Sequence, residues 1–398
     1  MTKLFLGPAL CLALSMATAN AHESLSQLPA TQMYLRGAMT YRDIADNTSA
    51  RMIPGALLGG EATAPEKNLQ LDDIQLVGHY LADDSYAISA KISGHEHNGD
   101  SNLTLENIWL TWGLNKSLIE IGRITTDITP TAYYHASESA FNEASLLSDV
   151  FFGRHFNDVG VRVKSSLHSI NAGIEGWRGG AWPSANNEGA ASAFASWQPV
   201  FYNSQLTLKT WAMNATSVDR RDDRYTNAHT HGSTAIVSSA ANIGFTGETQ
   251  LFGTFASIEH NMIQTQVFAE FEWIVSKLNG TLADDNIQSS QIDAEYSGSR
   301  ALLGVASQHH QWTVQFDNLI LKNHFLTAIN QQFLQQTGLM NNGTNPQKLM
   351  FAWQWDFHRD LSLRAQWQSE KLSENTVEYG SLGIVWSTAI DGARLRHR

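Results

Sequence analysis

Alternation of apolar and polar residues with a period of two runs through most of the chain from residue 31 onward. It is clearest in the second half, at residues 263–273, 312–317, 349–357 and 361–368, where one face is apolar and aromatic and the other polar. This is the pattern of a β-strand whose two faces meet different media. Each segment approaches the about 9–11 residues that a tilted strand needs to cross a membrane. The pattern therefore predicts an all-β chain of membrane-spanning strands.

The connections between these segments are expected to alternate in length. Bacterial outer-membrane barrels have short periplasmic turns and long outer loops, and lipid forces their sheets to close. We therefore predict a transmembrane antiparallel β-barrel of about 16 strands (range about 16–18) that forms a single domain over residues 22–398. A soluble β-sandwich or propeller is the alternative, although a propeller should show a blade repeat. Short links are expected at residues 83–84, 114–116, 165–168, 202–204, 246–248 and 359–360, and long loops at residues 44–70, 95–102, 125–157, 179–189, 218–233 and 322–347.

One stretch, residues 103–164, differs from the rest of the predicted wall. Two closely linked strands lead into a long irregular segment, residues 125–156, before the next strand begins at residue 158. Apolar side chains such as Phe141, Phe151 and Phe152 would be poorly placed in bulk water, so the segment should pack against something. Long irregular loops are usually functional. We expect this loop to fold inward and narrow the lumen; the alternative is a hydrophobic outer loop that contacts a partner or a neighbouring barrel.

Composition supports a chain that has one face toward lipid. Only 16% of the residues are charged, against about 25% in ordinary soluble domains, and the chain holds 12 Trp, 17 Phe and 10 Tyr. The first 21 residues read as a secretory signal, with Lys3, an apolar run and the small-x-small motif Ala19-Asn20-Ala21. The one cysteine, Cys11, lies in that signal. An exported chain without thiols excludes disulfides, iron–sulfur ligation and cysteine catalysis.

Charged side chains on the polar strand faces are candidates for the lumen. The formal net charge of −12 argues against nucleic acid as a partner. A mixed lining would create a transverse field that sorts solutes by charge and size; alternatively, these side chains form wall salt bridges that only rigidify the barrel. The predicted lining and constriction residues are Arg154, Arg162, Lys164, Tyr133, Tyr134, Glu120, Arg36, Arg42, Lys91 and Arg364, and further candidates are Lys209, Glu175, Glu270, Glu272, Asp317 and Asp356.

Histidines are the second conspicuous group, 15 in all. His95, His97, His229 and His231 form two i, i+2 pairs in predicted outer loops, where imidazoles could hold zinc or copper. The alternative is that these histidines are solvated loop residues that bind no metal. We expect neither a cofactor nor catalysis, because the common enzyme signatures are missing. A Ser/His lipase built on His231-Gly232-Ser233 is the remaining enzymatic alternative.

The order of short motifs around the long loop resembles the phosphate-selective porin O and P family. A strand ends in Gly122-Arg123, and after the loop the chain returns through Gly153-Arg154 and Asp158-Val159-Gly160-Val161. The resemblance implies a homotrimeric barrel of about sixteen strands through which small, often anionic, solutes diffuse passively. One departure is that this loop lacks a ladder of arginines and lysines, because Arg154 is the only such residue between Thr125 and Asn157.

These patterns together predict an outer-membrane porin. The protein would be exported by its cleaved signal and embedded in the lipid of the bacterial outer membrane. Small hydrophilic solutes or ions would diffuse through its water-filled barrel. The alternative is a non-conducting outer-membrane barrel that binds a metal or a partner through its histidine-bearing outer loops.

Overall fold

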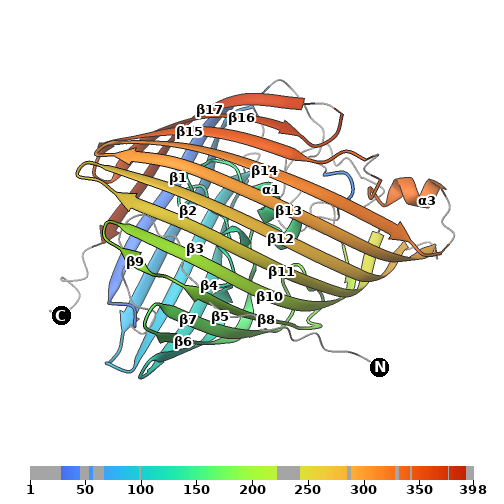
Figure 1. Ribbon diagram of the computed structural model, residues 1–398, viewed down its shortest axis with the longest axis horizontal. Helices are drawn as coiled ribbons and strands as arrows, with labels where there is room; N and C mark the ends of the chain where they lie inside the picture. The colour runs from blue at the N-terminus through green and yellow to red at the C-terminus, as the bar shows by residue number, and fades with distance from the viewer. Residues whose placement is uncertain are drawn as a thin grey trace.

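A single antiparallel sheet closes on itself into a barrel (Figure 1). Closure occurs where β1 (Gln32–Asp43) pairs with both β17 (Thr376–Ile390) and β2 (Leu69–Leu81). The predicted transmembrane-type antiparallel barrel is therefore confirmed. The computed structural model describes residues 28–44, 53–56, 67–97, 100–221, 243–284, 288–327, 331–340, 343–374 and 376–390. The predicted signal, residues 1–21, lies outside this range.

The strands follow one another around the barrel in chain order. β8 (Ala190–Trp197) and β9 (Val200–Phe201) both pair with β10 (Ser204–Arg220), so seventeen strands fill sixteen positions, within the predicted range. The other strands are β3 (Tyr86–His97), β4 (Asp100–Leu114), β5 (Ser117–Thr125), β6 (Asn157–Leu167), β7 (Ile170–Trp177), β11 (Ile243–Asn261), β12 (Thr265–Asp284), β13 (Ser289–Ser307), β14 (His310–Phe325), β15 (Gln347–His358) and β16 (Leu361–Lys371).

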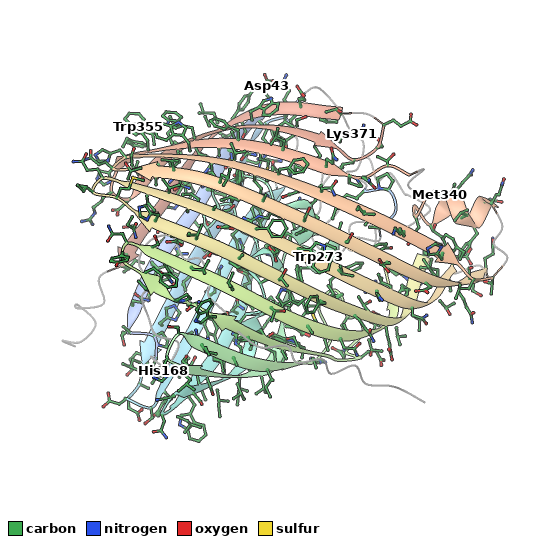
Figure 2. The ribbon with its side chains drawn as sticks, viewed as in Figure 1. Asp43, His168, Trp273, Met340, Trp355 and Lys371 are labelled. Carbon is green, nitrogen blue, oxygen red and sulfur yellow. The ribbon has the colours of Figure 1, made fainter. Side chains whose placement is uncertain are left out.

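The outward face of the wall carries the apolar side chains that the alternation predicted. On β12, Phe271 and Trp273 are 49% and 38% exposed, whereas the alternate residues Glu270 and Glu272 point inward and are buried. Trp273 lies in the middle of the wall, and Trp355 lies near the end that holds the turn at His168 (Figure 2). Alternate residues of a strand face opposite sides of the sheet, so the apolar residues gather on the outer face. An apolar outer face suits contact with lipid.

Two predicted connections are wrong. Residues 246–248 are not a turn; they lie inside β11, where Gly247 stands opposite Gly280 of β12. Each of these glycines marks a close approach of two backbones, since a Cβ on Gly247 would collide with the β12 backbone. Residues 95–102 are not a long loop either, because the ladder continues through the pair His95 and Asn102.

In the described part of the chain, the helices are short and lie in the connections between strands. They are the 3-10 turn η1 (Pro130–Ala132), α1 (Leu146–Phe152) and α3 (Gln331–Gln336). Among the described residues, no helix is long and apolar enough to cross a membrane. Figure 1 shows α1 inside the barrel behind β12 and β13, and α3 beyond the far end of the wall.

Candidate functional site

The connection between β5 and β6, residues 126–156, folds into the barrel as predicted and is called the inward loop below. Its two arms pair with each other: the amide of Tyr134 donates to the carbonyl of Arg154 (2.9 Å) and that of Phe156 to the carbonyl of Ala132 (2.8 Å). Between the arms lies α1, whose first turn is capped by the Ser145 hydroxyl. The loop is therefore a structured insert and not a slack connection.

Gly153 and Arg154 turn the chain out of α1 and back toward β6. Both have left-handed backbone conformations, with φ of 57° and 69°. Gly153 adopts this conformation without steric cost and ends the helix in the usual way. Arg154 then points back to α1, where its Nε lies 2.6 Å from Asp149. This predicted constriction residue thus pairs inside the loop itself.

One face of the inward loop is apolar and packs against the inner wall. Phe152 of α1 is fully buried, and its ring centroid lies 5.8 Å from that of Trp211 on β10. Phe156 makes an edge contact with Trp177 of β7 at 5.0 Å. These residues belong to one buried cluster that also contains Ile274 of β12. The inner face of β10–β14 is therefore partly a hydrophobic core, unlike the uniformly polar lining that the alternation suggested.

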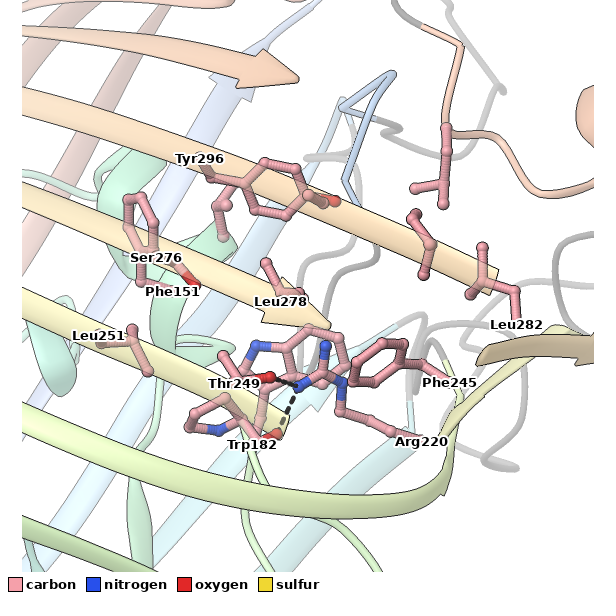
Figure 3. Close-up of a pocket in the computed structure, with 15 residues that line it drawn as sticks. Phe151, Trp182, Arg220, Phe245, Thr249, Leu251, Ser276, Leu278, Leu282 and Tyr296 are labelled. Carbon is pink, nitrogen blue, oxygen red and sulfur yellow. Dashed lines mark hydrogen bonds between the residues drawn. The ribbon is translucent and has the colours of Figure 1, made fainter. Parts of the chain in front are cut away.

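A small cavity of about 20 Å³ remains beside α1, between the loop and the inner wall (Figure 3). That volume holds one or two waters. Arg220 crosses its edge between the rings of Trp182 and Phe245, with its Cζ 4.2 and 4.7 Å from their centroids. Its Nη1 donates to Thr249 (3.0 Å) and to the carbonyl of Pro183. Arg220 of β10 therefore joins Thr249 of β11 to the segment that contains Pro183.

The other face of the inward loop is ionic and meets β1–β3. Glu138 of the loop accepts from Arg36 of β1 at 2.7 Å and pairs with Lys91 of β3 at 3.4 Å. Arg42 of β1 lies 2.8 Å from Glu143 of the loop, and it also pairs with Asp72 of β2. The basic residues predicted on these strands face the interior, and each one anchors the loop.

A second ionic group joins the start of the loop to β5–β7. Arg162 pairs with Glu120 at 2.6 Å and with Glu175 at 3.2 Å, and Lys164 pairs with Asp127 at 3.2 Å. Burial alone would raise the pKa of Asp127, but Arg162 and Lys164 outweigh it and hold that pKa below its usual range. Asp127 is therefore ionised at neutral pH and ties the loop to β6.

Two further predicted lining residues, Arg364 and Tyr134, make hydrogen bonds to the loop or within it. Arg364 of β16 donates to the carbonyl of Ala136 (3.0 Å) and to the side-chain oxygen of Asn142 (2.8 Å). The Tyr134 hydroxyl donates to the Phe141 carbonyl at 3.1 Å. All ten residues of the prediction lie inside the barrel; whether solute touches them stays a prediction.

Sequence reasoning missed a cluster on which the loop and the wall converge: Glu106, His135 and His155. His135 Nε2 lies 3.0 Å from Glu106 Oε1, and its Nδ1 lies 3.2 Å from Asp73 Oδ2. Burial and Lys91 lower the pKa of His135, but the two carboxylates outweigh them and raise it to about 9. Neither i, i+2 spacing nor alternation marks these residues, because loop folding brings them together.

The predicted metal residues are not assembled among the described residues. His95 lies on β3 and not in a loop, and its ring stacks on His135 with centroids 5.4 Å apart. The reason is that the β3–β4 ladder continues past the predicted strand end, which turns His95 toward the lumen. The backbone of His97 belongs to β3, but its side chain lies outside the described residues, as do His229 and His231.

Comparisons with known proteins show the type of barrel. No family model and no curated protein matches the sequence. The fold is similar to a loop-deletion mutant of OmpT, an outer membrane protein of Vibrio cholerae, with a TM-score of 0.52 at 10% identity over 90% of this chain and 98% of that one. It is also similar to OprB of Pseudomonas putida (0.53, 10%, 91% and 94%) and to the outer membrane channel DcaP of Acinetobacter baumannii (0.51, 10%, 90% and 96%). The chain thus has the fold of an outer-membrane β-barrel.

Proposed function

We propose that this protein is an outer-membrane porin through which small hydrophilic solutes or ions diffuse passively. The observation that carries the proposal is the closed barrel crossed by the inward loop, residues 126–156, which is tied to β1 and β3 on one side and to β6 on another. A loop held in this way reduces the lumen to a defined opening, which gives a pore its size limit. The proposal assigns no reaction to the barrel.

The proposed path runs along the ionic face of the loop. The most exposed partners there are Glu138 at 25%, Arg36 at 18% and Asp127 at 18%, whereas the α1 side is packed with apolar side chains. Hydrated solutes therefore meet paired charges of both signs. Because each charge has its counter-charge within a few ångströms, we expect discrimination by size to exceed discrimination by charge.

The proposal does not extend to phosphate selectivity. The only arginine or lysine of the inward loop, Arg154, pairs with Asp149 at 2.6 Å instead of facing a path for anions. Export through the signal at residues 1–21, residence in the bacterial outer membrane and a homotrimeric assembly belong to the same proposal. Crosslinking of the folded protein in native membranes tests the trimer, and a single monomeric band at all crosslinker concentrations would contradict it.

Planar-bilayer recording tests the channel itself. Purified, folded protein should give stepwise increases in current, and a salt gradient should give a small reversal potential because the lining is mixed. Protein from the same preparation that has been boiled serves as the control and should give no steps. A membrane that stays sealed at every voltage, with protein shown to be folded by heat-dependent migration, would contradict the proposal.

A second candidate, a non-conducting barrel that binds a ligand or partner, is favoured by the packed interior. The apolar cluster around α1 leaves a cavity of only about 20 Å³ at that side of the loop. Silence of the folded protein in the bilayer would favour this reading.

A further inference from the structure

Glu106, His135 and His155 come from three places and meet at the ionic face of the inward loop. Glu106 lies on β4 at a break in register between Lys91 and Ile92 of β3, so it is the extra residue of a β-bulge. A bulge redirects a side chain that regular alternation would place elsewhere. His135 directly follows the first paired arm of the loop, and His155 lies within the second arm, where it forms a β-bridge with Tyr133.

The ligand atoms of the three side chains lie within 4.8 Å of one another. The Glu106 oxygen and His135 Nε2 are already 3.0 Å apart, and the rings of His135 and His155 have centroids 4.9 Å apart. A tetrahedral ion with bonds of about 2.0–2.1 Å needs ligand atoms roughly 3.3 Å apart. Side-chain shifts of at most about 1.5 Å would therefore bring the three ligand atoms to the spacing of such a shell.

Asp73 lies where a metal-binding histidine normally has a supporting carboxylate. Its Oδ2 lies 3.2 Å from His135 Nδ1, the ring atom opposite the one that faces Glu106. The same oxygen accepts from the amide of Ser137 at 3.1 Å, which fixes the carboxylate in place. Metal-ligating histidines usually donate their second N–H to such a group, which orients the ring.

We propose that Glu106, His135 and His155 form a binding site for Zn²⁺, with Asp73 as the positioning residue for His135. Two imidazoles and one carboxylate are ligands that zinc accepts, and they leave one position for water. The inference does not rest on the proposed channel activity, because binding is measured on the folded barrel alone.

Lys91 is the group that opposes a cation here, since its Nζ lies 3.9 Å from Glu106. Its charge is shared, however, because it also donates to the Tyr133 hydroxyl at 2.6 Å and pairs with Glu138 at 3.4 Å. Asp73 adds a further carboxylate beside the cluster. The negative groups around the site therefore outnumber this lysine.

A bound ion would join the wall to both arms of the inward loop. Glu106 belongs to β4, whereas His135 and His155 lie on opposite sides of α1 in sequence. Such a crosslink would hold the loop against the polar half of the barrel, so zinc should slow its movement.

Equilibrium dialysis of the full-length folded protein in detergent, with buffered free Zn²⁺, tests the site. We expect His135→Gln, His155→Gln and Glu106→Gln each to weaken one zinc equivalent by tenfold or more, and Asp73→Asn to weaken it by about 10–100-fold. Co²⁺ added to the wild type should show the visible absorption of a tetrahedral site, and the same variants should lose it.

Two controls make the outcome decisive. His79→Gln removes another inward-facing histidine, which binds Tyr34 and Ser89 away from the cluster, and should leave zinc binding unchanged. The His229→Ala and His231→Ala double variant should also be unchanged, which separates this site from the outer-loop pairs. Heat-dependent migration must show that every variant is folded. Equal binding by wild type and folded His155→Gln, or an equal loss in His79→Gln, would overturn the proposal.

Discussion

Truncation of Phe152 should release the inward loop while leaving the barrel intact. Its side chain is fully buried, and its ring packs against Trp211, which is fully buried as well. Replacement of a buried phenylalanine by alanine costs about 3–5 kcal/mol, because the surrounding wall cannot collapse into the space. The substitution removes side-chain contacts between the loop and the wall and no hydrogen bond between strands. The lost free energy should therefore weaken docking of the loop and not closure of the barrel.

The magnitude converts directly into a population. At 1.36 kcal/mol for each factor of ten, Phe152→Ala should raise the undocked fraction of the loop by about 2.2–3.7 orders of magnitude. A thiol introduced by Ser148→Cys reports this fraction, because Ser148 lies on α1 and is 1% exposed. The native chain contains one cysteine, Cys11, inside the predicted signal, so the mature reporter should carry a single thiol.

The assay is the rate at which a water-soluble thiol reagent labels the reporter in the folded protein. When opening and closing are fast, this rate follows the open population. Phe252→Ala is the matched control: Phe252 is 42% exposed on the outer face of β11, so its truncation should leave labelling unchanged. Unchanged labelling in Phe152→Ala, or equal acceleration in both variants, would show that α1 does not hold the loop by this packing.

Three further predictions concern charge, pH and backbone. Glu138→Gln removes a partly exposed acid beside two bases, so the reversal potential in a salt gradient should shift toward anions; Glu248→Gln, on an exposed outer position, should not shift it. The folded-state pKa of Asp127 is depressed, so its pairing stabilises loop docking above the unfolded value near 3.8 and is lost as pH falls below it. Pepsin cleavage of residues 126–156 should therefore increase steeply only below about pH 4 in the wild type, and cleavage in Asp127→Asn should lack that pH dependence. Gly122 has φ of +145° and its Cβ would strike the β4 backbone, so Gly122→Ala should lose roughly 1–3 kcal/mol or more of stability. Gly176→Ala, with nothing within 4 Å of a Cβ, should unfold at nearly the wild-type temperature; equal midpoints in heat-modified gels would refute the strain argument.

The alternation of polarity was enough to predict the barrel and the facing of its strands. Phe271 and Trp273 point outward and Glu272 inward because lipid and lumen differ most sharply at mid-wall. The same logic explains where the pattern is lost. Leu319, Ile320 and Leu321 of β14 are apolar without interruption, since the inner two pack against protein inside the lumen. Loss of alternation in a spanning strand was therefore the available signal for an interior core.

The sequence was enough to name candidate residues for the lumen, but it did not show which side chains pair with one another. Arg36, Arg42 and Lys91 were expected on the lumen side of the strands, and the sequence left open whether they form a charged lining or wall salt bridges. The structure shows salt bridges both within the wall and from the wall to the inward loop. Glu106 and His155 could not be found because one depends on a bulge and the other on how the loop arms pair. Period-two reasoning carries no information on either.

The two faces of the inward loop contribute differently to its docking. Apolar contacts of α1 are non-directional and roughly proportional to buried area, so they supply attraction without fixing an exact position. The ion pairs require donors and acceptors within a few ångströms, so Arg36 and Lys164 set where the loop sits but add little where water reaches them. Movement that keeps α1 docked and breaks only the outer ion pairs is therefore the less costly change. Any widening of the lumen should begin on the polar side, beside Glu138, which is also where hydrated solutes can be accommodated without exposing the apolar core.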